Sequence, residues 1–159
     1  MMIARQTNLI KHGFTFIEVL IALGISIIVF VGIFQLFIHC TTLVEVSGDK
    51  NYVMYKIQQE MEKIRDYNFD LITTDYAPGG TLGNTFTLSP MTGIGVIEVA
   101  VIDANKLLKV RIVACWQGKN GRVIGEDVNF DGSLAVSEDV NNNLEIDSPA
   151  TITTLISKR

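Results

Sequence analysis

The chain contains the sequence Gly13-Phe14-Thr15-Phe16-Ile17-Glu18, and the residues that follow it are almost all apolar as far as Ile38. The 25 residues from Phe14 to Ile38 contain one charged side chain, that of Glu18. This length is enough to cross a hydrocarbon core of about 30 Å as an α-helix. Residues 14–38 are therefore predicted to form a membrane-spanning helix.

Charges on the two sides of this segment predict its orientation. Before Phe14 the chain has two basic residues, Arg5 and Lys11, and no acidic one. After Ile38 it has 16 acidic residues against 11 basic ones. Because positive flanks tend to stay in the cytoplasm, we expect a single-pass protein with its N-terminus inside and its larger part outside. The net charge of -4 gives no reason to expect a nucleic acid partner.

An amphipathic pattern follows the apolar segment, and no proline interrupts residues 41–67. Apolar residues recur there at spacings of three, four or seven, which predicts one buried stripe on a helix. The stripe consists of Val46, Val53, Ile57, Met61 and Ile64, with Gln58, Gln59, Glu62, Lys63 and Asp66 on the other side. We expect one helix from about Phe14 to Tyr67, of which residues 39–67 are the amphipathic half. Gly48 weakens it by about 1 kcal/mol relative to alanine.

The stripe needs a cover, and the following residues have the pattern of strands. Residues 68–125 are predicted to hold a connecting loop and an antiparallel sheet, and residues 148–159 a last strand. The expected strands are Thr85–Leu88, Gly95–Ile102, Leu107–Trp116, Arg122–Ile124 and Thr151–Ile156. The expected turns are Pro78-Gly79-Gly80, Gly83-Asn84, Asp103-Ala104-Asn105 and Gly118-Lys119-Asn120-Gly121. The predicted fold class is α+β, with the outer half of the helix packed on a small antiparallel sheet.

Two cysteines are compatible with an oxidising compartment without proving one. Cys40 lies at the outer end of the apolar segment, and alternation along the strand 107–116 places Cys115 on the polar face, away from the helix. An intrachain disulfide is therefore disfavoured but left open. Trp116 falls on the apolar face, where a core residue is favoured over a ligand platform.

No pattern in the chain indicates catalysis. His12 stands in the first 13 residues and His39 is alone at the end of the apolar segment. The chain has no Ser-His-Asp or Cys-His arrangement, no phosphate-binding glycine loop and no Cys/His metal spacing. The protein is therefore predicted not to be an enzyme.

The motif Gly13–Glu18, followed by the apolar run Val19–Leu23, resembles the class III signal of type IV pilins and of the pseudopilins of type II secretion. In that family a membrane peptidase cuts after the glycine and methylates the new N-terminal amine. The resemblance implies that residues 1–13 are a cleaved leader, that Phe14 is methylated, and that the apolar helix is retained. The helix-then-sheet order extends the resemblance to most of the chain.

The same resemblance gives Glu18 a role in assembly. A carboxylate inside hydrocarbon is costly unless it is paired. In the family this glutamate is thought to meet the N-terminal amine of a neighbouring subunit, which would reward correct register. The alternative for Glu18 is an interfacial residue whose side chain reaches water. Gln35 stands where many pilins have a proline, so local melting of the helix at that point is in doubt.

The resemblance implies a structural subunit, of the minor class rather than the major one, and a set of partners. These are other pilin or pseudopilin subunits, prepilin peptidase, the inner-membrane assembly platform and membrane lipid. Nucleic acid would be a partner only of a DNA-uptake filament. The expected location is the bacterial inner membrane and then a pilus or periplasmic pseudopilus. Pilus, type II secretion and DNA uptake remain open. The alternative function is a binding or adhesion module at the filament tip.

Residues 126–147 form a separate acidic segment, with seven Asp or Glu, four Asn and no Lys or Arg. Its spacing Asp127-x-Asn129-x-Asp131-Gly132-x5-Glu138 matches the twelve-residue EF-hand calcium loop. Ser133 would supply a backbone carbonyl, and Leu134 would anchor the loop in the core. All the side-chain donors are hard oxygens, so the predicted ion is Ca²⁺.

The pattern recurs after twelve residues, because Glu126-Asp127-Val128-Asn129 is echoed by Glu138-Asp139-Val140-Asn141. The second copy has Leu144 in place of the glycine and Ala150 at position twelve, with Ile146 in the place of Leu134. Its expected ligands are Asp139, Asn141, Asn143 and Asp147. One or two ions both fit this pattern, and an Asp/Asn-rich turn without metal is the alternative for each loop.

Overall fold

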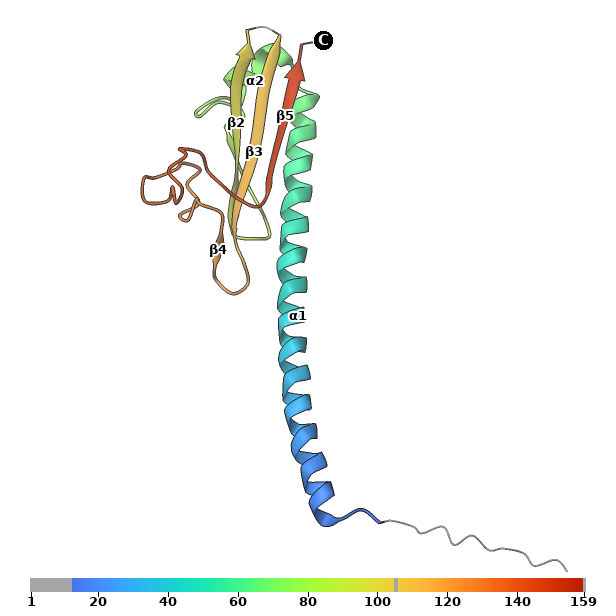
Figure 1. Cartoon of the computed structure of the whole chain (residues 1–159). Helices are drawn as coiled ribbons and strands as arrows, with labels where there is room; N and C mark the ends of the chain where they lie inside the picture. The colour runs from blue at the N-terminus through green and yellow to red at the C-terminus, as the bar shows by residue number, and fades with distance from the viewer. Residues whose placement is uncertain (1–12, 105, 159) are drawn as a thin grey trace, which may run out of the picture. The chain divides into compact units, whose positions relative to one another are not determined.

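A computed structural model describes residues 13–104 and 106–158 of the chain (Figure 1). The chain divides into two compact units, Met1–Leu43 and Val44–Arg159, called here the N-terminal and the C-terminal unit. The predicted leader lies almost wholly outside the described residues, which begin at Gly13. The same holds for Asn105 in the predicted turn between two strands.

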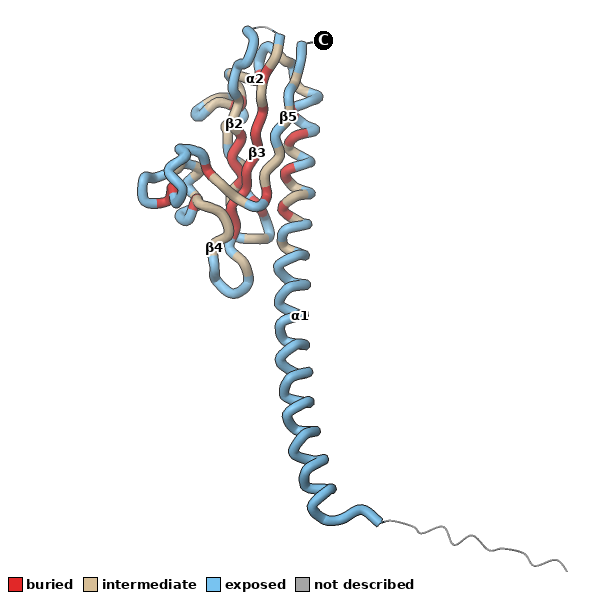
Figure 2. Tube along the Cα trace, viewed as in Figure 1, coloured by how far each residue is buried: buried red, intermediate tan, exposed pale blue. Residues whose placement is uncertain are grey.

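The first helix, α1, runs from Phe16 to Arg65 and confirms the single long helix expected from residues 14–67. Within the N-terminal unit every described residue of α1 is exposed (Figure 2). Phe30, for example, keeps 72% of its surface accessible. By length and composition, α1 contains a stretch that is long and apolar enough to cross a membrane.

Within the C-terminal unit one stripe of α1 is buried. Val53, Ile57, Met61 and Ile64 are at most 3% exposed and follow a helical spacing of three or four residues. The prediction was wrong for Val46, which is 45% exposed. Tyr52 is the first residue of α1 that belongs to the main core of this unit, so Val46 lies outside that core.

A second helix, α2, spans Phe69–Asp75, where the sequence pattern predicts a connecting loop. The prediction was wrong for these residues. Asn68 caps it by accepting a hydrogen bond from the amide of Asp70 at 3.1 Å. Ile72 is buried in the core. Seven residues contain too few turns for a helical period to be recognised.

The sheet is antiparallel and five-stranded, as predicted. Its central strand, β3, pairs with β2 on one side and with both β4 and β5 on the other. The short strand β1 extends the sheet beyond β2. The bounds are β1 Thr85–Thr87, β2 Gly93–Asp103, β3 Leu107–Gln117, β4 Val123–Ile124 and β5 Thr151–Ser157.

One face of β3 packs against α1 and forms the main core. Its members on β3 are Leu108, Val110, Ile112, Ala114 and Trp116. Trp116 is 1% exposed, which confirms its assignment to the core. Its indole Nε1 has no hydrogen-bond partner among the described residues.

The opposite face of β3 carries a second core, which corrects the prediction for Cys115. This thiol points away from α1, as expected, but it is 1% exposed and does not lie on a polar face. The acidic segment covers it, together with Val113, and contributes Phe130, Leu134 and Ile146. Leu134 and Ile146 are therefore the apolar anchors of the two loops. Both Cys40 and Cys115 are free thiols.

Candidate functional sites

The N-terminal site lies at the start of α1. Thr15 and Glu18 form a capping box: the carboxylate of Glu18 accepts hydrogen bonds from the Thr15 amide at 2.8 Å and from its hydroxyl at 2.9 Å. The Thr15 hydroxyl accepts from the Glu18 amide at 3.4 Å. The spacing Thr15-x-x-Glu18 is the sequence signal of this cap, which is not among the predictions made above. Within a single chain, the carboxylate of Glu18 therefore already accepts hydrogen bonds from Thr15 at the start of its own helix.

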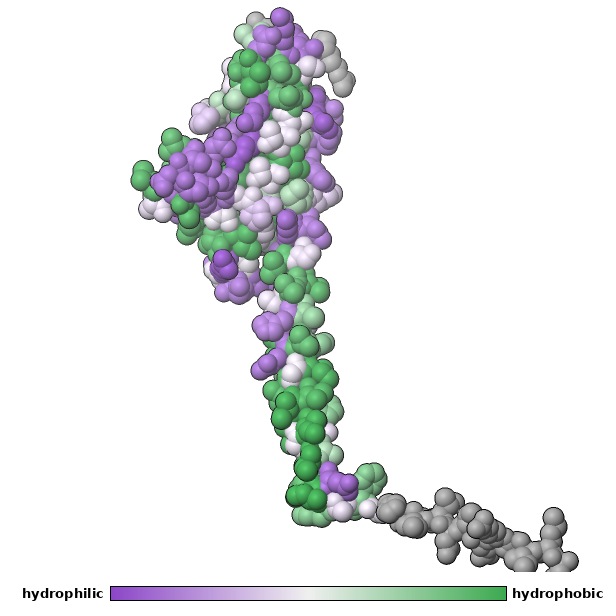
Figure 3. All heavy atoms as spheres, viewed as in Figure 1, coloured by the Kyte–Doolittle hydropathy of each residue, from purple (hydrophilic) through white to green (hydrophobic). Residues whose placement is uncertain are grey.

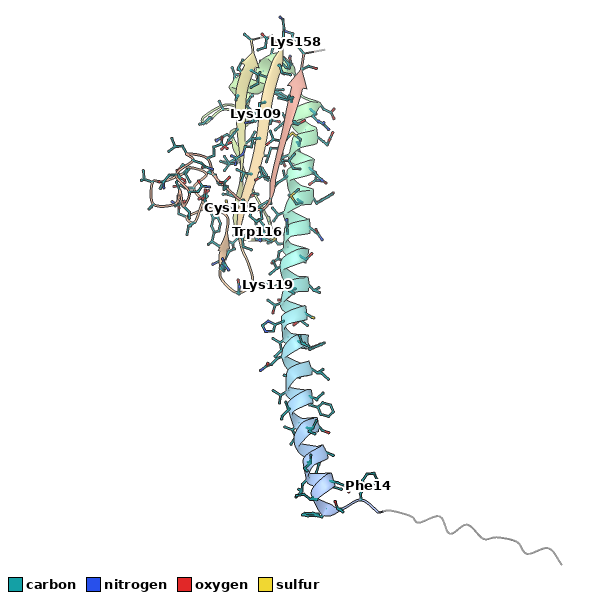
Figure 4. The ribbon with its side chains drawn as sticks, viewed as in Figure 1. Phe14, Lys109, Cys115, Trp116, Lys119 and Lys158 are labelled. Atoms are coloured by element: carbon teal, nitrogen blue, oxygen red, sulfur yellow. The ribbon has the colours of Figure 1, made fainter. Side chains whose placement is uncertain are left out.

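Gly13 and Phe14 precede this cap and are exposed. Phe14, labelled in Figure 4, retains 90% of its surface. A Cβ atom built on Gly13 would meet no other atom within 4 Å. Packing therefore does not require glycine at this position.

The second candidate site is the acidic segment, whose first loop is a compact turn. Both carboxylate oxygens of Asp127 accept backbone amides, from Asp131 at 3.2 Å and from Gly132 at 2.9 Å. Asn129 accepts from the Asp131 amide at 2.9 Å, and Asp131 accepts from the amide and hydroxyl of Ser133 at 2.8 and 2.6 Å. These side chains therefore bond the backbone of their own loop and hold it as a compact Asp/Asn-rich turn.

The second loop repeats the first, twelve residues later. Asp139 accepts from the amides of Asn143 at 3.1 Å and Leu144 at 3.0 Å. Asn141 accepts from the Asn143 amide at 3.0 Å, and Asn143 from that of Glu145 at 2.8 Å. The backbone repeats as well, with left-handed residues at equivalent places: Phe130 and Asn142 (φ 58° and 57°), and Gly132 and Leu144 (φ 79° and 61°).

A glutamate closes each loop by accepting two backbone amides. Glu138 is the last residue of the first loop, and Glu126 directly precedes that loop. Glu138 accepts from the amides of Val128 at 3.1 Å and Ala135 at 3.1 Å in the first loop. Glu126 accepts from the amides of Val140 at 3.3 Å and Asp147 at 3.0 Å, which are the equivalent positions of the second loop. Glu126 thus replaces the glutamate that the second loop lacks at Ala150.

Glu126 is the residue that the site prediction missed. The echo of Glu126-Asp127-Val128 in Glu138-Asp139-Val140 was a signal for it, because it gives the two glutamates equivalent positions. The second loop has Ala150 at its own twelfth position. Glu126 closes it instead, because the two loops lie close enough for its carboxylate to reach the amides of Val140 and Asp147.

Among the described residues, buried Asp127 has no basic partner, whereas the half-exposed end of the segment pairs with Arg111 on the sheet. Asp127 is fully buried, and the resulting desolvation raises the pKa of its carboxyl above its usual range. Arg111 of β3, 8% exposed, donates to Glu98 at 2.7 Å, to the carbonyl of Ile146 at 2.6 Å and to Asp147 at 3.3 Å. Arg111 therefore attaches the end of the acidic segment to the outer face of the sheet.

The donors suit Ca²⁺ by type, since all are oxygens of Asp, Asn and Glu side chains or of the backbone. Asp127, Asn129, Asp131 and Glu138 gather around the first loop, and Asp139, Asn141 and Asn143 around the second. Asp147 instead accepts the amide groups of Asn141 at 2.7 Å and Asn143 at 2.8 Å. Across residues 13–104 and 106–158, no three His, Cys, Asp or Glu side chains are close enough together to form a metal site.

In comparisons with known proteins, no family model, no curated protein and no solved structure matches this chain.

Proposed function

We propose that this chain is a structural subunit of a pilus-like filament, either a type IV pilus or a type II secretion pseudopilus. It is made as a membrane precursor, cleaved between Gly13 and Phe14, and methylated on Phe14. The observation that carries the proposal is the sequence Gly13–Glu18, which leads into the first turn of a 50-residue helix whose first part is apolar and exposed. Such a helix needs lipid or neighbouring helices to cover it.

Gly13 supports the processing step because the packing of the folded chain does not require glycine at this position. Its surroundings are open, and the adjoining bond lies in an exposed segment ahead of the helix. A requirement for glycine would then come from a peptidase that must bring its active site close to the scissile bond. The charged residues Arg5 and Lys11 would hold that bond at the cytoplasmic side.

Glu18 supports the assembly step. After cleavage, the positive amine of Phe14 would be only four residues from this carboxylate. In a bundle of such helices, the amine of one subunit and Glu18 of another would neutralise each other in a medium where isolated charges are costly. The capping contact with Thr15 holds Glu18 in the first turn of α1 until that partner arrives.

A structural Ca²⁺ in the acidic segment is part of the proposal. Asp127, Asn129, Asp131, the Ser133 carbonyl and Glu138 would hold an ion in the first loop. In the second, Asp139, Asn141, Asn143 and Asp147 would do so, with small side-chain shifts in both. The support is the repeated turn, its oxygen donors and the burial of Asp127 without a basic side chain in the segment. The ion would offset the mutual repulsion of seven acidic residues.

The cleavage step is tested by replacing Gly13 with valine. We expect G13V to remain at the length of the precursor in the native host, because a branched side chain would obstruct the scissile bond. Mass spectrometry of the purified chain gives its N-terminus and its methylation. Gly24→Ala is the matched control, since Gly24 is equally open and should leave processing unchanged. Efficient cleavage of G13V at the same bond would contradict the proposal.

The assembly step is tested by comparing Glu18 with its capping partner. Thr15→Val removes the hydroxyl of the capping box, at a cost of about 1 kcal/mol to the helix end, whereas Glu18→Gln keeps an oxygen that can accept from the Thr15 amide. Only the Glu18 variant removes the charge that would meet a neighbouring amine. We therefore expect E18Q, but not T15V, to be lost from sheared filaments while remaining in the membrane. Equal incorporation of both variants would rule out the assembly role of Glu18.

A further inference from the structure

The acidic segment carries exposed aliphatic side chains that serve no purpose within the C-terminal unit. Val136, Val140 and Leu144 are 94%, 82% and 86% exposed, and none belongs to either core. Hydrophobic side chains border the hydrophilic surface of this protruding segment in Figure 3. These three residues and the carboxylates of residues 126–147 are called here the acidic apolar surface.

A surface of complementary character lies on the same unit. On the outer face of the sheet, Ala100, Lys109 and Leu155 are register neighbours across β2, β3 and β5. Ala100 is exposed and Leu155 is 60% exposed, so the acidic segment does not cover this part of the face. These three residues are called the lysine patch, of which Figure 4 labels Lys109. Lys158 is not part of it, because its side chain pairs with Asp70 of α2 and lies over the ring of Phe69, which packs on the main core.

Lys109 is central to this patch. Among the residues that the structure describes, it has no ion pair within 4.0 Å, whereas Lys106 and Lys158 pair with Asp103 and Asp70. The lysine patch therefore presents an uncompensated positive charge between two exposed apolar side chains. The acidic apolar surface presents the opposite arrangement, with apolar side chains among carboxylates and no basic residue in residues 126–147.

We propose that the acidic apolar surface of one copy of this chain docks on the lysine patch of a second copy. Opposite charges orient the contact, and the aliphatic side chains lose their exposure to water. The two surfaces are different, so the contact is heterologous and can propagate from copy to copy. This inference rests on the proposed filament function, in which the apolar helices hold copies side by side. A small contact then suffices, because the effective concentration is high.

The charge of the acidic segment argues against two other occupants. An anionic lipid surface and nucleic acid would both be repelled by the net negative charge of this segment, because its seven carboxylates outnumber the charges of two bound Ca²⁺ and it has no basic residue. A basic protein surface with apolar side chains is the chemistry that fits, and the chain itself carries such a surface.

Cysteine crosslinking of the full-length chain tests the contact directly. In a Cys40→Ser background, one variant carries Leu144→Cys and another Leu155→Cys. The remaining native thiol, Cys115, is buried and serves as an internal control. Under mild oxidation in detergent micelles, the mixture of the two variants should form disulfide heterodimers. Each variant alone should form few homodimers, because a heterologous contact does not bring equal residues together.

Charge reversal gives an independent readout on the same chain. Lys109→Glu in the Leu155→Cys variant should lower the heterodimer yield by about tenfold, as expected when like charges face each other in a contact. Lys109→Gln should have a smaller effect in the same direction. Lys119→Glu is the matched control, because Lys119 is an exposed lysine on the turn between β3 and β4 and should leave the yield unchanged.

The outcomes separate this inference from the proposed function. Filaments that contain the chain but give no Leu144–Leu155 crosslink would overturn the docking contact and leave the filament function standing. Crosslinked heterodimers from a chain that is never cleaved after Gly13 would support the contact and refute the processing step. If Val140→Ser and Leu144→Ser abolish binding to another protein while crosslinking stays absent, the occupant is a tip-binding partner and the inference is wrong.

Discussion

Arg111 is the residue on which the attachment of the acidic segment depends. Its guanidinium is almost fully buried and satisfies two carboxylates and one main-chain carbonyl, on β2 and on the acidic segment. Removing one member of such a set leaves the others without a partner, which costs more than the set contributes when intact. This contact joins residues 98, 111 and 147, whose proximity the sequence could not indicate.

We predict that Arg111→Met lowers the free energy of unfolding of the C-terminal unit by about 2–3 kcal/mol, the scale of a lost hydrogen bond to a charged group. Half-exposed Glu98 and Asp147 keep some contact with water, which limits the loss. Urea denaturation of the soluble fragment from Val44 measures it. Lys109→Met, on the same face but without an ion pair, should change the free energy of unfolding by less than about 0.5 kcal/mol. Similar losses in the two variants would mean that Arg111 acts only by its aliphatic stem.

Gly48 is the weak point at the scale of the helix. It lies in the interior of α1, it is exposed, and a Cβ atom there would meet nothing within 4 Å. Glycine is unfavourable in a helix interior because it loses more conformational freedom on folding than alanine. The fold therefore gives no reason for glycine at this position, which lies between the exposed apolar part of α1 and its buried stripe.

We predict that Gly48→Ala slows amide hydrogen exchange around residue 48 by about fivefold, the equivalent of about 1 kcal/mol of helix stability. The measurement uses the full-length chain in detergent micelles. Gly79→Ala is the contrasting variant, because its surroundings are equally open but its φ of 78° is left-handed. That substitution should destabilise the chain. Unchanged exchange in G48A would show that other contacts already hold this part of α1.

At the same scale, the sequence predicted the long helix and all five strands, because their apolar patterns extend over many residues or end at strong turn signals. The pattern failed where burial depends on a distant element. Val46 continues the stripe of α1, yet nothing lies over it. Cys115 alternates onto the outer face of β3, yet the acidic segment covers that face. Neither outcome follows from local periodicity.

At the scale of the whole molecule, the two units divide the proposed roles. The described residues of the N-terminal unit are exposed throughout, as the proposed burial of this unit in lipid or among other subunits requires. The C-terminal unit has two cores of its own on opposite faces of one sheet. The second core exists only while the acidic segment stays folded over Val113 and Cys115. The spacing predicts the two acidic loops, whereas the closure of the second loop by Glu126 depends on how the loops lie relative to each other.

The calcium proposal can be tested through this second core, with Cys115 as a native reporter. If Ca²⁺ stabilises the acidic segment, then removing it with EGTA should expose Cys115 more often. We therefore predict faster alkylation of Cys115 in a Cys40→Ser chain after EGTA, together with a lower melting temperature of the C-terminal unit. Asp127→Asn removes the charge of a central predicted ligand of the first loop with little change of shape, so in that variant both quantities should respond less to calcium. An alkylation rate and a melting temperature that are both unaffected by EGTA in the C40S chain would leave the loops as Asp/Asn-rich turns. Glu126 and Glu138 would then close these turns without an ion.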